Sequence, residues 1–163
     1  MRILVTGAGG FIGRRVCVAL QQAGHTALGL DIAPEDGRGL TIVADITKPL
    51  SLGGGIDAVI HLDVDVSGTL PVLRLALASG AEKVVFASSA HVYGVGPRYW
   101  PTDETHPLSL GNTYTTTKIL GEELCQLYHE NHGLSYTVLR LFNAYGPGQG
   151  KGYFIPDQLA KAA

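Results

Sequence analysis

The sequence has few charged residues, only two cysteines, and no hydrophobic run long enough to span a membrane. Charged residues make up 16% of the 163 residues, and 12 Lys and Arg against 14 Asp and Glu give a net charge of -2. No basic stretch could follow a phosphate backbone, which argues against nucleic acid as a partner. No run of about 18 apolar residues exists either, so we expect no membrane association.

The cysteines and the N-terminus indicate a reducing compartment. Cys17 and Cys125 lie in apparent helices rather than at loop positions that a disulfide framework would pin, so we expect free thiols. The first residues, MRILVTGAGG, begin a strand directly, without the charged and apolar regions of a signal peptide. We therefore expect a cytoplasmic protein.

Length and hydrophobicity bound the architecture. A chain of this length can bury most of the surface that its unfolded form exposes, but a second substantial domain does not fit. Hydrophobic residues at 45% are typical of a globular chain. We predict a single domain over residues 1–163, and we expect no metal site.

Short apolar runs alternate with helical patterns along the chain. The predicted strands are 2–6, 26–31, 40–46, 58–62, 84–88 and 136–141, and the predicted helices are 11–23, 68–78, 113–132 and 155–163. Pro71 is tolerable in its helix because it falls in the first turn of the predicted range. Such alternation predicts an α/β fold whose doubly wound parallel sheet, in the strand order 3-2-1-4-5-6, is covered by helices on both faces.

The first connection carries the pattern of a dinucleotide-binding Rossmann domain. Gly7, Gly10 and Gly13 lie three residues apart between a strand and a helix, where a Cβ would obstruct a pyrophosphate and the helix N-terminus offers free N–H groups. Asp31 follows Gly7 by 24 residues, at the end of the second strand, where its carboxylate can accept both hydroxyls of a ribose. The same carboxylate would repel a 2′-phosphate, so NAD is favoured over NADP.

Three alternatives stay open at this connection. A tight turn of this kind can bind nothing at all. Arg14 and Arg15 follow the last glycine and could offset the repulsion between Asp31 and a 2′-phosphate. Asp45 could contact adenine or could cap the end of a strand.

Four segments in order resemble the extended short-chain dehydrogenase/reductase family. They are TGAGGFIG (6–13) with Asp31, VVFASSAHVYG (84–94), YTTTK (114–118) and LRLFNAYGPG (139–148). Within that family the chain is most similar to the NAD-dependent nucleotide-sugar epimerase/dehydratase branch, typified by UDP-glucose 4-epimerase. The resemblance implies that Phe11, Ile12, Asp45, Ile46, Leu62, Tyr114 and Lys118 join the glycines and Asp31 at the cofactor.

A catalytic set follows from the residues and from the resemblance. A helix puts Tyr114 and Lys118 one turn apart on one face, where an ammonium can lower the pKa of a phenol and make it a general base. Ser89 lies at the carboxyl end of a strand, where open α/β sheets bind ligands. By resemblance, Tyr114 removes a hydroxyl proton as hydride passes to nicotinamide, Lys118 anchors the nicotinamide ribose, and Asn143 touches a substrate phosphate.

Each of these residues also has a structural interpretation. A Tyr and a Lys four residues apart are common on exposed helices, and Ser88 and Ser89 could merely cap a strand. His61 closes a strand, where we interpret it as a hydrogen-bonded core residue rather than a ligand. His91 stands where dehydratases of the family carry an acidic residue, which disfavours dehydration.

Two departures from the family affect the predicted function. His61 and Leu62 lead through Asp63 and Asp65 almost directly into the next helix, so the loop that flanks the nicotinamide is missing. The sequence also ends near the point where the family begins its nucleotide-sugar segments, so we expect the substrate domain to be largely absent.

Two functions are therefore weighed. The first is an NAD-dependent oxidoreductase or epimerase that acts on a sugar-like hydroxyl, with a nucleotide sugar as the candidate substrate. The second is a catalytically silent NAD-binding module, acting as a sensor or as half of a complex. The resemblance also implies a homodimer through helices 68–78 and 113–132.

Overall fold

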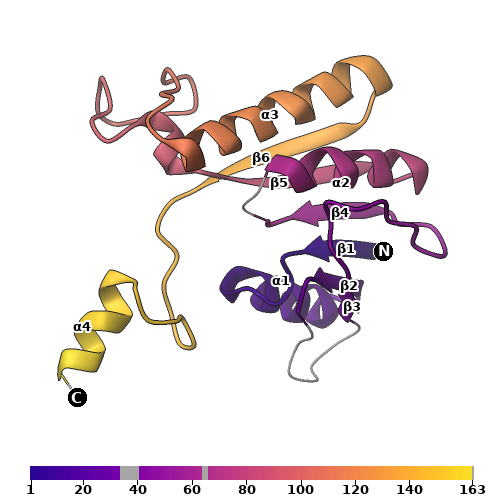
Figure 1. Ribbon diagram of the computed structural model, residues 1–163, viewed down its shortest axis with the longest axis horizontal. Helices are drawn as coiled ribbons and strands as arrows, with labels where there is room; N and C mark the ends of the chain where they lie inside the picture. Colours follow the sequence, from indigo (N-terminus) through magenta and orange to yellow (C-terminus); the bar gives the residue numbers. More distant parts are fainter. Residues whose placement is uncertain (34–40, 64–65, 163) are drawn as a thin grey trace.

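The protein is described by a computed structural model that covers residues 1–33, 41–63 and 66–162. Its strands are β1 (Arg2–Thr6), β2 (Thr26–Asp31), β3 (Thr41–Val43), β4 (Ala58–His61), β5 (Lys83–Ser89) and β6 (Ser135–Leu141). These form one parallel sheet in the order β3-β2-β1-β4-β5-β6 (Figure 1). The predicted doubly wound order is confirmed.

Helices cover the sheet from both sides. α1 (Phe11–Gln22) packs against β1 and β2 on one face, while α2 (Val66–Ala78) and α3 (Thr113–His132) lie side by side on the other face, over β4, β5 and β6 (Figure 1). A short 3₁₀ helix, η1 (Ala90–Tyr93), follows β5 directly and was not predicted from the sequence. The last helix, α4 (Phe154–Ala162), stands apart from the sheet at the end of an extended segment (Figure 1).

The strands β1 and β2 are buried on both faces, which is why they are continuous apolar runs rather than alternating ones. In β1, four of the five residues are buried, and in β2 four of the six. The larger core cluster joins the sheet to α2 and α3 through side chains such as Leu4, Val59, Phe86, Leu73 and Cys125. Burial raises the pKa of the Cys125 thiol to about 12, and Cys17 and Cys125 are thiols rather than disulfide partners, as predicted.

Two predicted boundaries differ from the structure by more than one residue, and several others differ by one. The third strand ends at Val43 instead of residue 46, because the Asp45 carboxylate accepts hydrogen bonds from the backbone N–H (2.9 Å) and the hydroxyl (2.7 Å) of Thr47 and so forms a turn. α2 begins at Val66 rather than residue 68, so Pro71 lies in its second turn and removes one helical hydrogen bond. Packing on the sheet, where Val72 and Leu73 are fully buried, offsets that loss.

A polar contact crosses the core at the end of β4. His61 is 1% exposed, and its Nδ1 lies 2.6 Å from Thr6 Oγ1 while its Nε2 lies 3.1 Å from Thr69 Oγ1. Burial, and then the charge of Lys118, lower the pKa of His61 to about 3. The interpretation of His61 as a hydrogen-bonded core residue is confirmed.

A search of the described residues finds no helix that combines the length and the apolar character needed to cross a membrane.

The burial of neutral His61 predicts an acid-sensitive fold. The unfolded chain takes up a proton on this imidazole below pH 6.5 and the native chain does so only near pH 3, so stability is present above pH 6.5 and is lost as the pH falls. Urea unfolding of the wild type should lose about 2 kcal/mol more between pH 6.5 and 5 than that of His61→Asn. Equal losses in the two proteins, or a His61 imidazole that titrates above pH 5 by NMR, would contradict this.

Candidate active site

The glycine turn between β1 and α1 is shaped by close backbone contacts. Gly7 has φ +69°, and its carbonyl accepts a hydrogen bond from the Gly10 N–H at 3.1 Å. A Cβ on Gly13 would lie 2.1 Å from the Gly7 carbonyl oxygen, so no other residue fits there without moving the helix. The three glycines thus serve the turn and the helix packing, as the sequence predicted.

The start of α1 fits an anionic group. Gly10 is the N-cap and provides no capping side chain, and the first turn contains no acidic residue. The first N–H groups of a helix have no partner within the helix and carry partial positive charge, so a phosphate would satisfy them. The backbone of this turn therefore fits the pyrophosphate of a dinucleotide.

Asp31 lies beside this turn. It ends β2, and its Oδ2 accepts a hydrogen bond from the Gly9 N–H at 2.9 Å. Arg14 and Arg15, which could offset the repulsion between Asp31 and a 2′-phosphate, both form hydrogen bonds with the backbone. Arg14 Nε donates to the Gly9 carbonyl, and Arg15 donates to the Phe11 carbonyl. The Asp31 carboxylate therefore stands beside the glycine turn, and its contact with a ribose hydroxyl stays a prediction.

A cleft of about 790 Å³ opens at the carboxyl ends of the strands. It brings together the glycine turn and all four residues predicted for catalysis and substrate contact, although they come from four separate segments of the chain. The predicted residues along its wall are Gly7, Gly10, Phe11, Ile12, Gly13, Leu62, Ser89, Tyr114, Lys118 and Asn143.

Three predicted cofactor residues lie outside this cleft wall. Asp31 is at the glycine turn, as described above. Asp45 is engaged in its own turn, where the hydrogen bonds from Thr47 lower its pKa. Ile46 is 4% exposed and packs in the core beneath Gly68 of α2. The strand-end interpretation of Asp45 accounts for its contacts, and an adenine contact of Asp45 and Ile46 stays a prediction.

Lys118 is buried between α3 and the sheet. It is 4% exposed, and its ammonium donates hydrogen bonds to the backbone carbonyls of Asp63 (2.7 Å) and Ala87 (2.9 Å). Burial lowers the pKa of Lys118 to about 8, while the charge of Asp63 acts in the opposite direction. An ammonium has three N–H donors, so one remains for a group in the cleft.

His91 contacts both Ser89 and Tyr114. Its position in the sequence was interpreted above only as evidence against dehydration. Ser89 is 5% exposed, and its hydroxyl oxygen lies 3.0 Å from Nδ1 of His91. The ring of His91 meets that of Tyr114 edge to face, with centroids 6.2 Å apart. His91 therefore belongs to the site, and the two-residue spacing from Ser89 was the only signal for it in the sequence.

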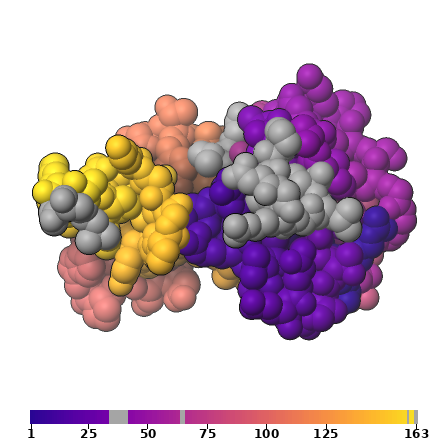
Figure 2. Space-filling model, turned by 90° about the horizontal axis from the view of Figure 1, so that it is seen from below, coloured from indigo at the N-terminus to yellow at the C-terminus, as the bar shows by residue number. Residues whose placement is uncertain are grey.

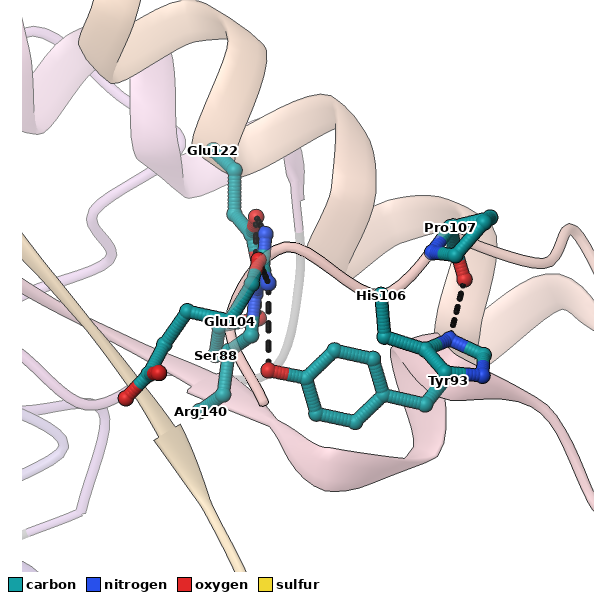
Figure 3. Close-up of polar contacts among 7 residues, drawn as sticks. All are labelled: Ser88, Tyr93, Glu104, His106, Pro107, Glu122 and Arg140. Carbon is teal, nitrogen blue, oxygen red and sulfur yellow. Dashed lines mark hydrogen bonds and ion pairs between the residues drawn. The ribbon is translucent and has the colours of Figure 1, made fainter. Parts of the chain in front are cut away.

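A polar network surrounds Ser88, the residue that precedes Ser89 in the sequence (Figure 3). Arg140 of β6 and Glu122 of α3 form an ion pair at 2.8 Å, and Glu122 also accepts a hydrogen bond from the Ser88 hydroxyl. Arg140 donates further to the Tyr93 hydroxyl (3.1 Å) and the Glu104 carbonyl (3.0 Å). The hydrogen bonds to Glu122 raise the pKa of Arg140. The network joins β5, η1, α3 and β6.

The segment after β6 closes one side of the cleft. Phe142, Asn143, Ala144 and Tyr145 line it, followed by Gln149 and the residues 153–155. Arg15 of α1 stacks on Phe11 and donates a hydrogen bond to the Pro147 carbonyl. Figure 2 shows the yellow C-terminal segment against the indigo N-terminal half, the two parts that this contact joins. Asn143 thus lies in the same cleft as the glycine turn.

Comparisons with known proteins agree with this geometry. A model of the NAD dependent epimerase/dehydratase family matches residues 3–163. The UDP-glucose 4-epimerase 4 of Oryza sativa subsp. japonica is 32% identical over 194 aligned residues, which cover 95% of this chain and 52% of the rice protein. Because that alignment is longer than this chain, the rice protein has additional residues within the matched region.

Solved structures are similar over the same region. A short-chain dehydrogenase/reductase superfamily protein from Agrobacterium tumefaciens with bound NAD has a TM-score of 0.79 and 33% identity, over 86% of this chain and 48% of that one. The UDP-glucose 4-epimerase from Thermotoga maritima with UDP-glucose has a TM-score of 0.81 and 26% identity, over 92% and 58%. The chain spans about half the length of the relatives it matches.

The polar network around Ser88 predicts a costly substitution. Glu122→Ala should reduce the free energy of unfolding by about 3 kcal/mol, because it leaves the Arg140 guanidinium and the Ser88 hydroxyl without their shared carboxylate. Glu130→Ala, on the exposed side of the same helix, is the matched control and should cost no more than about 0.5 kcal/mol. Similar losses in the two variants, measured by urea unfolding, would mean that the network contributes no more than a surface contact.

Proposed function

The chain belongs to the NAD-dependent epimerase/dehydratase family, and from that membership we propose that residues 1–163 form the dinucleotide-binding and catalytic region of a nucleotide-sugar epimerase or oxidoreductase. The observation that carries the proposal is the single cleft that holds both the glycine turn and the residues Ser89, Tyr114 and Lys118. A cofactor site and an acid–base set in one cleft are what hydride transfer at a hydroxyl-bearing carbon requires.

The cofactor of the proposal is NAD. The free N–H groups at the start of α1 bind its pyrophosphate, and Asp31 accepts hydrogen bonds from the adenine-side ribose. The carboxylate of Asp31 already faces the turn through the Gly9 N–H, and no 2′-phosphate can approach it without repulsion. NADP is disfavoured for that reason.

The nicotinamide, when bound, supplies the acceptor and later the donor of the hydride. Tyr114 takes the proton of the substrate hydroxyl as its phenolate and returns it afterwards. Ser89 forms a hydrogen bond with the same oxygen and holds it beside Tyr114. Lys118, with a pKa of about 8, is charged at neutral pH, and this charge favours the phenolate of Tyr114, while its remaining N–H holds the nicotinamide ribose.

The substrate class is a nucleotide sugar, supported by the relatives named above. Asn143 lies on the cleft wall beyond Tyr114 and offers an amide to a substrate phosphate. The backbone carbonyl of Asp63 accepts a hydrogen bond from the Lys118 ammonium. The connection after β4, which is predicted to be shorter than in the family, can therefore still hold the ammonium in place. Epimerisation is favoured over dehydration because Ala90 and His91 stand where dehydratases carry acids.

Replacement of the phenol tests the proposal. Tyr114→Phe should bind NADH with the affinity of the wild type, as measured by nicotinamide fluorescence. Because it lacks the general base, its bound NAD should be reduced by UDP-glucose roughly 100-fold more slowly than in the wild type. Asp31→Ala is the complementary control and should weaken NADH binding. A wild type that binds NADH but transfers no hydride from any nucleotide sugar would instead identify a catalytically silent module.

We also propose that the chain pairs with a second copy through α2 and α3. The two helices lie side by side, and Leu120 and Leu127, seven residues apart on α3, are each 48% exposed. Apolar side chains in one stripe of a helix are the usual means of forming a symmetric interface.

Charges in this stripe should dissociate the pair. The double variant Leu120→Glu, Leu127→Glu should be a monomer by light scattering at a concentration at which the wild type is a dimer. Val18→Glu, which changes a 45% exposed residue on α1 at the opposite face, should stay dimeric. A wild type that is monomeric at high concentration rules out the pairing.

A further inference from the structure

We propose that His91 is a proton-relay partner of Ser89, which gives the cleft a second path for the proton of the reacting oxygen. The inference rests on the proposed function, since the oxygen in question is that of the substrate hydroxyl held by Ser89 and Tyr114.

The geometry places His91 on the cleft side of Ser89. The imidazole Nδ1 lies 3.0 Å from the Ser89 hydroxyl oxygen, within the range of a hydrogen bond. His91 itself lines the cleft, together with Tyr114 and Lys118, and its ring faces the edge of Tyr114. η1 fixes this arrangement because it begins directly after Ser89, which caps it.

The donor and acceptor positions of the Ser89 hydroxyl allow Ser89 and His91 to act together. A serine hydroxyl has one donor and two acceptor positions. One acceptor position of Ser89 is taken by the His91 backbone N–H at 3.3 Å. When Nδ1 is unprotonated, the hydroxyl donates to it and keeps one free acceptor position for a substrate hydroxyl. When Nδ1 carries a proton and donates to Ser89, the hydroxyl is free to donate to a substrate carbonyl oxygen.

The relay step balances with the proposed reaction. The substrate O–H bond breaks and its proton passes to the Ser89 oxygen, while the Ser89 hydroxyl proton passes to Nδ1 of His91. The C–H bond of the same carbon breaks and its hydride passes to the NAD of the proposed function. The sugar is oxidised to a carbonyl compound, the dinucleotide is reduced, and His91 becomes an imidazolium. In the reverse sequence the imidazolium returns its proton to the oxygen through Ser89, while the hydride is delivered to the opposite face of the carbonyl carbon.

The relay adds a second base to the site, because an unprotonated imidazole nitrogen accepts a proton directly. The other titratable groups of the described cleft wall are Tyr114 and Lys118 of α3 and Tyr145 and Tyr153 of the segment after β6, with Asp63 acting on Lys118.

His91→Asn separates proton transfer from hydrogen bonding. The asparagine Oδ1 can accept a hydrogen bond from Ser89 as Nδ1 does, but it cannot take a proton, so a purely structural cap would survive the change. The experiment measures reduction of bound NAD by UDP-glucose in a single turnover between pH 5 and 9. His25→Asn, a histidine at the amino-terminal end of β2 and therefore at the opposite edge of the sheet, is the matched control.

We expect His91→Asn to reduce NAD at pH 7 at a rate roughly 10-fold below that of the wild type. Its NADH binding should be unchanged, and its rate should lack the dependence on pH that an imidazole confers. In the Tyr114→Phe background, where the relay is the remaining path, His91→Asn should abolish the residual turnover. Ser89→Ala should also shift the Nδ1 resonance of His91 in ¹⁵N NMR spectra, with no substrate present.

Other outcomes overturn the inference in distinguishable ways. If the wild type is active and His91→Asn matches its rate at every pH, His91 has only a structural part in η1 and the relay alone is wrong. If the Nδ1 resonance ignores Ser89→Ala, the hydrogen bond does not exist in solution. If the wild type binds NADH but transfers no hydride from any nucleotide sugar, the proposed function fails and the relay fails with it.

Discussion

The buried ammonium of Lys118 connects the parts of the site. Its hydrogen bonds to the carbonyls of Asp63 and Ala87 attach α3 to the segment after β4 and to β5 at the same time. A charged group that is 4% exposed is expensive to bury unless its donors are satisfied, so this contact determines how deep α3 lies against the sheet. Tyr114 lies one turn earlier on the same helix, and its position in the cleft depends on that contact.

A second set of polar contacts holds the same face of the helix one turn further along. Glu122, one turn after Lys118, pairs with Arg140 and accepts from Ser88, which directly precedes Ser89. The helix thus has Tyr114, Lys118 and Glu122 at intervals of four residues, on one face and toward the sheet. The first is directed at the cleft, the second at the strand ends, and the third at a network that joins β5, η1 and β6. One helix face therefore serves both stability and chemistry.

The connection between fold and function runs through the carboxyl edge of a parallel sheet. All the strands end at that edge, so the residues that follow β1, β4, β5 and β6 meet there although they are far apart in the sequence. The glycine turn, Leu62, Ser89 and Asn143 are brought to one cleft in this way. The Asp63 carbonyl, two residues after the end of β4, also reaches Lys118 at this edge.

The sequence by itself determined the strand order, the glycine turn with Asp31, and the residues proposed for the chemistry, because periodicity, glycine spacing and the four family segments are local properties of the chain. Only the tertiary structure decided the end of β3 at Val43, the start of α2 at Val66, and the place of Ile46 in the core. These depend on side-chain hydrogen bonds and packing between distant segments. The role of His91 emerged in the same way, because two rings 23 residues apart in sequence become neighbours only when η1 packs against α3.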